Sequence, residues 1–327
     1  MLDISALNDD GPTANGLFGR AWGAIASRNV DALDGCLALA PELALEGGSE
    51  GMGAHDIFAR IAANHFQPLA RSQAKRAKSL FHHACEKNSL DCANLLLREG
   101  ARLNICCASG KRLTNPLLDL FFGVANAPES PKKEAKTAAF ARTLINAGAR
   151  FPHAENDAWN VAQCMASLGF FVLAQIALDA AAFNAQDSFS VNQATLSLSG
   201  AAASGNLAAL RFFLSALPAR EIFERAAQFN QDSTLARACS RSGGAPEQAP
   251  ATVKCLEALL DAGELLEALP PPLSAELRTR SAFHACIGEW IDWKRAQSEA
   301  RSLRAALPSP ASENASDDMS RAARRRL

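Results

Sequence analysis

The chain has 327 residues, of which 48% are hydrophobic and 20% are charged, and its formal net charge is -1. A balance this close to neutral gives no electrostatic footprint for nucleic acid or for an anionic membrane surface. Aromatic residues make up only 6% of the chain and tyrosine is absent, while alanine and leucine dominate, and this composition favours helices over sheets.

The cysteines indicate a reducing compartment. There are nine of them, an odd number, and the chain is too long for a disulfide-stapled miniprotein. Most lie beside alanine in apolar stripes, where a free thiol behaves as a small buried hydrophobe; these are Cys85, Cys92, Cys164, Cys239, Cys255 and Cys286. The N-terminal MLDIS carries an acid instead of a basic signal region, and no run of 18 uncharged apolar residues occurs. We therefore expect a cytoplasmic location and no membrane association.

The first part of the chain predicts an arm, a helix pair and an additional helix. Residues 1–16 are polar and contain glycine and proline, which is typical of a flexible arm. From Leu17 two apolar stripes at helical spacing flank a break at Arg28-Asn29, and the second stripe ends at Pro41. Residues 46–53 predict a flexible link, and residues 54–71 predict a further amphipathic helix.

Residues 79–104 contain the clearest pattern in the chain. Apolar residues recur at helical spacing before and after a break at Asn88-Ser89, and the second stripe ends at Gly100. Glycine takes a left-handed position after a helix without steric cost, so the pattern predicts a helix–turn–helix that ends at Gly100. Each helix is too short to be stable alone and must bury its stripe against a neighbour.

This stretch resembles one ankyrin repeat, whose usual form is T-P-L-H-x-A-A, then Gly-His, then L-L-L-x-x-G-A. Residues 81–85 read FHHAC, Asn88-Ser89 stands at the Gly-His turn, and residues 95–101 read LLLREGA. The departure is at Thr-Pro, where Ser79-Leu80 stands instead.

Further units of the same kind follow. They cover residues 115–149 with an insertion at 126–135, then 161–177, 198–214, and 235–263 with a loop at 242–251, before a terminal helix that starts near Phe283. The small residue at the centre of the first helix of each unit, or the residue that stands in its place, is Ala24, Ala84, Leu120, Met165, Ala201, Ala238 and Ala285. The steps are 60, 36, 45, 36, 37 and 47 residues, and the shorter ones approach the ankyrin period of about 33.

The predicted fold is all-α. It is an ankyrin-like α-solenoid of about six to seven irregular helix-hairpin repeats over residues 17–307, with a helical C-terminal cap and a disordered tail at 308–327. The structural alternative is another α-solenoid, whose helices would be longer. The arginine-rich end of the tail is compatible with three roles: it keeps the chain soluble, it binds an acidic surface, or it is a targeting signal.

No motif in the chain predicts catalysis, a metal site or a cofactor. A phosphate loop before Lys111 would need glycine at position 105, where Ile105 stands. His82, His83 and Cys85 lack a second ligand pair at zinc-site spacing. His82 stands at the ankyrin histidine, for which the resemblance implies a structural role in hydrogen bonding between turns.

The resemblance implies a concave protein-binding face built from hairpin tips and the exposed positions of first helices. The matching positions are His83, Glu86, Lys87, Asp119, Phe122, Arg237 and Arg241. Trp159, just ahead of a first helix, is predicted as an aromatic anchor, because interfaces favour tryptophan and arginine. Trp290 and Trp293 are expected to pack the terminal cap.

The sequence therefore predicts a non-enzymatic scaffold, adaptor or inhibitor, for example an immunity protein, that binds another protein and no nucleic acid or membrane. The alternative is an effector exported by a bacterium into a host cell, since high alanine and arginine suggest a GC-rich bacterial genome. An enzyme with an unrecognised site is the third hypothesis.

Overall fold

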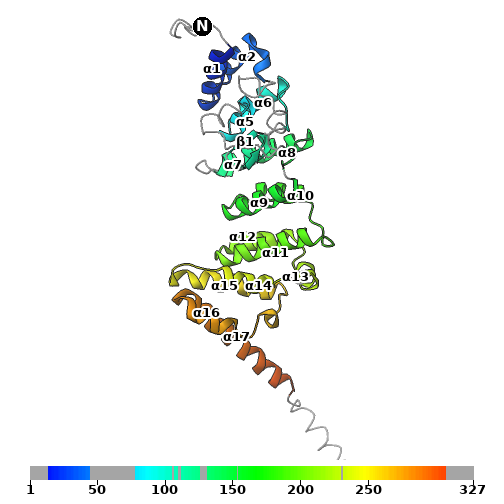
Figure 1. Ribbon diagram of the computed structural model, residues 1–327, viewed down its shortest axis with the longest axis vertical. Helices are drawn as coiled ribbons and strands as arrows, with labels where there is room; N and C mark the ends of the chain where they lie inside the picture. The colour runs from blue at the N-terminus through cyan, green and yellow to red at the C-terminus, as the bar shows by residue number, and fades with distance from the viewer. Residues whose placement is uncertain are drawn as a thin grey trace, which may run out of the picture. The chain divides into compact units, whose positions relative to one another are not determined.

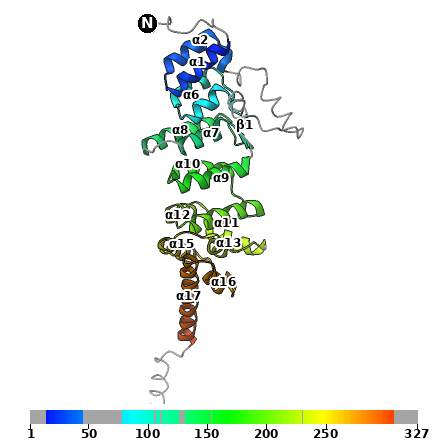
Figure 2. The ribbon, with the colours of Figure 1, turned by 60° about the vertical axis from the view of Figure 1, so that its left-hand side comes forward.

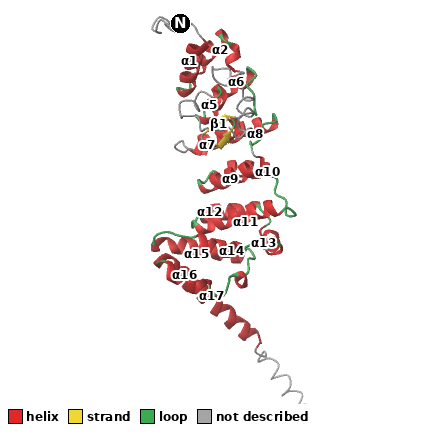
Figure 3. Cartoon of the chain, in the orientation of Figure 1, coloured by secondary structure: helices red, strands yellow, loops and turns green. Residues whose placement is uncertain are grey.

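A computed structural model describes residues 14–44, 78–104, 107–109, 112–125, 131–152, 154–229 and 231–306. These residues are mainly helical, with one short pair of strands in addition, as Figure 3 shows. The helix predicted over 54–71 and the tail at 308–327 lie outside the described residues. The chain divides into two compact units, Met1–Asn184 (unit 1) and Ala185–Leu327 (unit 2), which are described separately.

The described part of unit 1 consists of helical hairpins and one β-hairpin (Figure 1). Its elements in chain order are α1 (Ala14–Ala26), α2 (Val30–Leu39), the 3-10 helix η2 (Pro41–Ala44), α5 (Leu80–Glu86), α6 (Leu90–Arg98), β1 (Cys107–Ser109), β2 (Arg112–Thr114), α7 (Pro116–Ala125), α8 (Pro131–Asn146), α9 (Ala154–Ser167) and α10 (Phe171–Ala181). The strands are antiparallel, with Cys107 opposite Thr114 and Ser109 opposite Arg112.

Unit 2 contains the remaining helices. They are α11 (Ser188–Ala203), α12 (Leu207–Ala216), α13 (Ala219–Gln228), α14 (Thr234–Arg241), η3 (Pro246–Gln248), α15 (Ala249–Asp261), η4 (Leu266–Ala268), α16 (Leu273–Arg280) and α17 (Ala282–Ala306). The sequence prediction missed α13 and α16, and it assigned residues 131–135 to an insertion before the second helix, although they are the start of α8.

The two helices of a pair are joined by the same backbone geometry at four places. Between α1 and α2, α5 and α6, α9 and α10, and α11 and α12, one residue has a left-handed backbone: Arg28 (φ 58°), Asn88 (φ 50°), Gly169 (φ 84°) and Gly205 (φ 68°). The N–H of the following residue donates to the carbonyl five residues earlier, over 2.8–3.0 Å, and the acceptors are Ala24, Ala84, Met165 and Ala201. This is the Schellman arrangement. Its acceptors are four of the seven positions from which the repeat spacing was counted.

Asparagine connects two helices with one side chain at two of these links. The backbone N–H of Asn29 and of Asn206 donates the hydrogen bond back to the preceding helix. The side-chain oxygen of each asparagine then accepts a hydrogen bond from a backbone N–H of the next helix, that of Ala32 or Ala209, at 3.0 Å. The same residue thus ends one helix and caps the next.

Within unit 1 the first helices pack on one another in chain order, α1 on α5, α5 on α7 and α7 on α9 (Figure 1). Of the second helices, α2 packs on α6 and α8 on α10 (Figure 2). The crossing of α5 and α7 brings the two backbones close, because a Cβ on Gly123 of α7 would lie only 2.7 Å from the carbonyl oxygen of Cys85. The core between these helices includes Phe81 and Phe121, both fully buried.

Unit 2 repeats part of this arrangement and ends in a long helix. Helix α11 packs on α14, α12 on α15, and α15 on α17, while α16 packs along α17. Arg295 of α17 donates to the carbonyls of Leu269, Pro270 and Pro271 at 3.1 Å, which fixes α17 to the segment before α16. Trp290 is buried, as expected for a cap, but Trp293 is 51% exposed, so its predicted packing role is wrong. Cys286, predicted to be buried, is exposed.

The left-handed backbone at the end of second helices gives a direct test of the fold. Gly100 has φ 89°, and Ala101 N–H donates to Leu96 at 2.9 Å, which confirms the predicted helix end. Gly100→Val should lower the free energy of unfolding by about 1–2 kcal/mol, because a β-branched side chain is strained in this conformation. Urea unfolding followed by circular dichroism measures the change.

Gly35→Val is the matched control. Gly35 lies on an exposed face of α2, and a Cβ added to it would meet no heavy atom within 4 Å, so valine there should leave the urea midpoint unchanged or raise it. Equal midpoints for Gly100→Val and the wild type would show that the left-handed cap is wrong.

Candidate partner-binding surface

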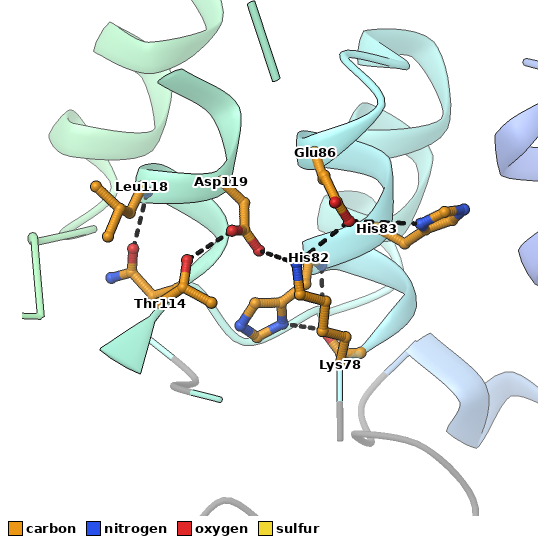
Figure 4. A network of polar contacts seen from close by, with 9 residues as sticks. Lys78, His82, His83, Glu86, Thr114, Leu118 and Asp119 are labelled. Atoms are coloured by element: carbon orange, nitrogen blue, oxygen red, sulfur yellow. Dashed lines mark hydrogen bonds and ion pairs between the residues drawn. The ribbon is translucent and has the colours of Figure 1, made fainter. Parts of the chain in front are cut away.

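A polar network links three elements of unit 1 at the positions predicted to form the binding face (Figure 4). Helix α5 starts at Ser79, whose hydroxyl accepts His82 N–H at 3.2 Å and lies 2.7 Å from His82 Nδ1. His82 is fully buried, which agrees with the structural role predicted for it. The same Ser-x-Phe-His start recurs at α17, where Ser281 Oγ lies 2.7 Å from His284 Nδ1.

Lys78, which precedes this cap, is the cation of the network. Its Nζ lies 3.2 Å from Glu86 Oε2 and 3.5 Å from Asp119 Oδ2, and its side chain is largely buried. Burial lowers the pKa of Lys78, but the carboxylates of Asp119 and Glu86 raise it by more, so the net shift is upward. The amine is therefore protonated at neutral pH and serves as an ion-pair partner, not as a base or nucleophile.

The two carboxylates have opposite pKa shifts. Burial raises the pKa of Asp119 to about 6, against the opposing effects of Lys78 and of Thr114, whose Oγ1 donates to Asp119 Oδ1 at 2.5 Å. His83, with Nδ1 3.9 Å from Glu86 Oε2, and Lys78 hold the pKa of Glu86 at about 2 in spite of its partial burial. Glu86 thus stays ionised when Asp119 takes up a proton.

Three of the predicted binding residues are not available on a surface. His83 is only 3% exposed because Trp22 of α1 stacks on its ring at 3.7 Å between centroids. Asp119 is 5% exposed because it faces Lys78 and Thr114. Trp159 is 0% exposed and packs edge-on against Phe183, so the prediction of an exposed aromatic anchor is wrong. It is a core residue of α9.

The remaining predicted residues are accessible to different degrees. Lys87 and Arg241 are exposed, and Glu86, Phe122 and Arg237 are half-buried. Arg237 donates to Asn192 Oδ1 at 2.8 Å, which ties α14 to α11, and its Nε lies 3.8 Å from Asp232. The structure brings His83, Glu86 and Asp119 into one network, while Arg237 and Arg241 belong to unit 2.

Unit 2 contains a groove that the sequence did not predict. It has a volume of about 1060 Å³ and lies between α13 and the segment that joins α15 to η4. Apolar and charged side chains share its lining, and they include Arg220, Phe223, Glu224, Ala227, Asp261, Glu264, Leu265 and Ala268. Leu265 is 63% exposed. The helical spacing of Ile222, Phe223 and Ala226 after Pro218 was the signal that could have located α13.

Glu264 is the buried carboxyl of this groove. Burial raises its pKa to about 7, and the polar groups of Thr234, Leu265 and Leu235 beside the carboxyl oppose the rise. Thr234 and Leu235 belong to the first turn of α14, so the carboxyl lies close to the start of that helix.

The buried thiols of the described residues are poor nucleophiles. Burial raises the pKa of Cys85 well above its ordinary value and that of Cys239 to about 12, and the thiolate is the reactive form. Across the described ranges, no group of three or more His, Cys, Asp or Glu side chains is arranged to hold a metal ion. None of the helices within those ranges has the length and apolar character needed to cross a membrane.

Neither a scan of protein-family models nor a search of curated proteins finds a match to this chain.

The opposite pKa shifts in the network predict opposite dependences of stability on pH. In the folded protein the pKa of Asp119 is raised from 3.8 to about 6. Its contribution to the free energy of unfolding is therefore complete below pH 3.8 and is lost as the pH rises through 6. Asp119→Asn should remove this loss. The difference in free energy of unfolding between the variant and the wild type should then shift in favour of the variant by up to about 3 kcal/mol between pH 4 and 7.

Glu86→Gln is the control of opposite sign for this experiment. Because the folded pKa of Glu86 is lowered from 4.5 to about 2, the wild type loses stability relative to this variant as the pH falls from 4.5 towards 2. Urea titrations at each pH measure both differences, and parallel curves for Asp119→Asn and the wild type would contradict the assignment.

The burial of Trp159 predicts a large loss of stability upon its truncation. Trp159→Ala should lower the free energy of unfolding by about 3–5 kcal/mol, because it leaves a large cavity in unit 1. Trp293→Ala, on the exposed side of α17, should change it by less than about 1 kcal/mol. A melting temperature that is equally lowered in both variants would be inconsistent with this difference in burial.

Proposed function

We propose that the chain is a protein-binding scaffold built from ankyrin-like helical hairpins, without enzymatic activity of its own. The observation that carries the proposal is the recurring left-handed link, with its return bond to Ala24, Ala84, Met165 and Ala201. The same backbone geometry at all four links favours an array of repeated helical hairpins over a collection of unrelated helices.

Repeated hairpins favour binding for a physical reason. Each pair buries its apolar stripe against the neighbouring pairs, so the remaining sides of the helices and the links are free for contacts with a partner. In the ankyrin family, which residues 79–104 resemble, such surfaces bind proteins. The same reasoning supports an adaptor or an inhibitor equally.

The groove of unit 2 is the surface that we propose for the partner. It combines an exposed leucine, Leu265, and the ring of Phe223 with charged side chains, among them Arg220 and Glu224. Protein interfaces usually combine apolar and charged groups in this way. The exposed Lys87 and Arg241 remain candidates for additional contacts outside the groove.

Comparison of two surface leucines tests this proposal. Leu265 in the groove and Leu39 at the end of α2 are 63% and 71% exposed, so aspartate at either position should leave the protein folded. Tagged wild type, Leu265→Asp and Leu39→Asp are used to capture proteins from the source cells, and the partner is identified by mass spectrometry and purified.

Calorimetry with the purified partner then gives the dissociation constant for each variant. We expect Leu265→Asp to weaken binding roughly tenfold or more and Leu39→Asp to leave it unchanged. A partner that binds all three proteins equally would show that the groove is not the binding surface. The absence of any stoichiometric partner would contradict the scaffold function itself.

A further inference from the structure

A second concave site lies in unit 1, at the links between paired helices. It has a volume of about 390 Å³ and is bounded by the α1–α2 link, the α5–α6 link and the first turns of α8. Arg28, Lys133 and Lys136 line it, and Asp91 is the carboxylate among the lining residues. Three cations from two separate elements therefore converge on one pocket with a single opposing charge.

The cations are placed by contacts within the unit. The guanidinium of Arg28 donates to the backbone carbonyl of Lys87 at 3.5 Å, which holds it beside the α5–α6 link. Burial, and then the charge of Arg28, lower the pKa of Lys133, as expected for an amine in a positively charged pocket. Glu134, between the two lysines in sequence, is engaged elsewhere, because its Oε1 accepts Val172 N–H at 2.9 Å.

The start of α6 adds backbone donors to the pocket. Ser89, the N-cap, makes no side-chain cap hydrogen bond, and Ser89, Leu90 and Asp91 all line the pocket. The first N–H groups of a helix have no acceptor within the helix, and the helix dipole favours an anion at this end. Helix α6 has nine residues, long enough for this end to carry a partial positive charge.

Asn88 supplies a buried polar group that lacks a partner. It lines the pocket, is only 6% exposed, and takes the left-handed conformation that ends α5. Its Oδ1 accepts Thr137 Oγ1 of α8 at 3.1 Å, so the amide is held between the two elements that bound the pocket. Its Nδ2 has no hydrogen-bond partner, although a buried donor without an acceptor is costly.

We propose that this pocket binds a phosphate monoester dianion. Arg28, Lys133 and Lys136 supply the countercharge, the first N–H groups of α6 supply directed donors, and Asn88 Nδ2 gains an acceptor. A dianion with three terminal oxygens matches this donor set better than a carboxylate, which has two oxygens and one charge. The proposal concerns a site that is separate from the groove of unit 2, and it stands or fails independently of the scaffold function.

The first experiment uses inorganic phosphate as the probe with the full chain. Calorimetric titration at pH 7.5, with sodium chloride adjusted to constant ionic strength, should show saturable binding to the wild type. Lys133→Gln/Lys136→Gln should weaken this binding roughly tenfold or more, because each glutamine removes a charge but keeps the helix. Lys254→Gln, an exposed lysine of unit 2, is the matched control and should bind as the wild type does.

Asn88→Gly tests the amide without straining the backbone. Glycine accepts the φ of 50° at this position, so a loss of phosphate affinity of about tenfold can be assigned to the side chain. Circular dichroism spectra and melting temperatures without phosphate verify that each variant is folded. If the wild type binds phosphate no more strongly than it binds chloride, the proposal is overturned. It is also overturned if the double lysine variant binds phosphate as tightly as the wild type does.

The source of the phosphate group is decided by two further titrations. A phosphoserine peptide that binds at least tenfold more tightly than inorganic phosphate, while its unphosphorylated form does not bind, would assign the pocket to a phosphorylated protein. Equal affinities for the peptide and inorganic phosphate would assign it to a small phosphorylated molecule. Both results support the phosphate site, and failure of every phosphate probe overturns it.

Discussion

The left-handed residue between paired helices is the constraint on which the described structure depends. It reverses the chain within three residues, and its return bond satisfies a carbonyl that would otherwise be free at the helix end. Glycine meets this requirement at Gly169 and Gly205, and asparagine, which adopts the left-handed region readily, meets it at Asn88, whereas Arg28 adopts the same conformation at a cost of about 1–2 kcal/mol. Tolerance of that cost at Arg28 indicates that the packing of the α1–α2 pair, not the local preference of the link, determines the geometry there.

The sequence was sufficient to predict the features that depend on local chemistry. Gly100 ends α6 as expected, and the breaks at Arg28-Asn29 and Asn88-Ser89 are the observed links. Helices α13 and α16 were missed because neither resembles a helix of the repeat. The first turn of α8 was also missed, since proline at position 131 indicates a loop as readily as the first turn of a helix.

The candidate site was predicted only in part, because exposure is a tertiary property. The ankyrin resemblance grouped Glu86 with His83, and the two side chains do lie together, but the resemblance contained no information that Trp22 of another helix covers His83. Lys78 was missed because nothing in the sequence around it distinguishes an ion-pair partner from a solvated lysine. Trp159 was predicted just ahead of a helix, whereas it lies within α9. A tryptophan in such a segment is equally compatible with an anchor and with the core, and burial decides between them.

The shared lysine of the polar network constrains how this protein can change during evolution. Lys78 serves two carboxylates that lie eight and 41 positions further along the chain, so the effect of replacing one of the three depends on which others are still present. Loss of Lys78 first leaves Asp119 and Glu86 without their shared cation, whereas loss of Asp119 first leaves Lys78 paired with Glu86. Substitutions that are harmful in one order are thus tolerated in the other, and the accessible paths begin at one of the two carboxylates and not at Lys78.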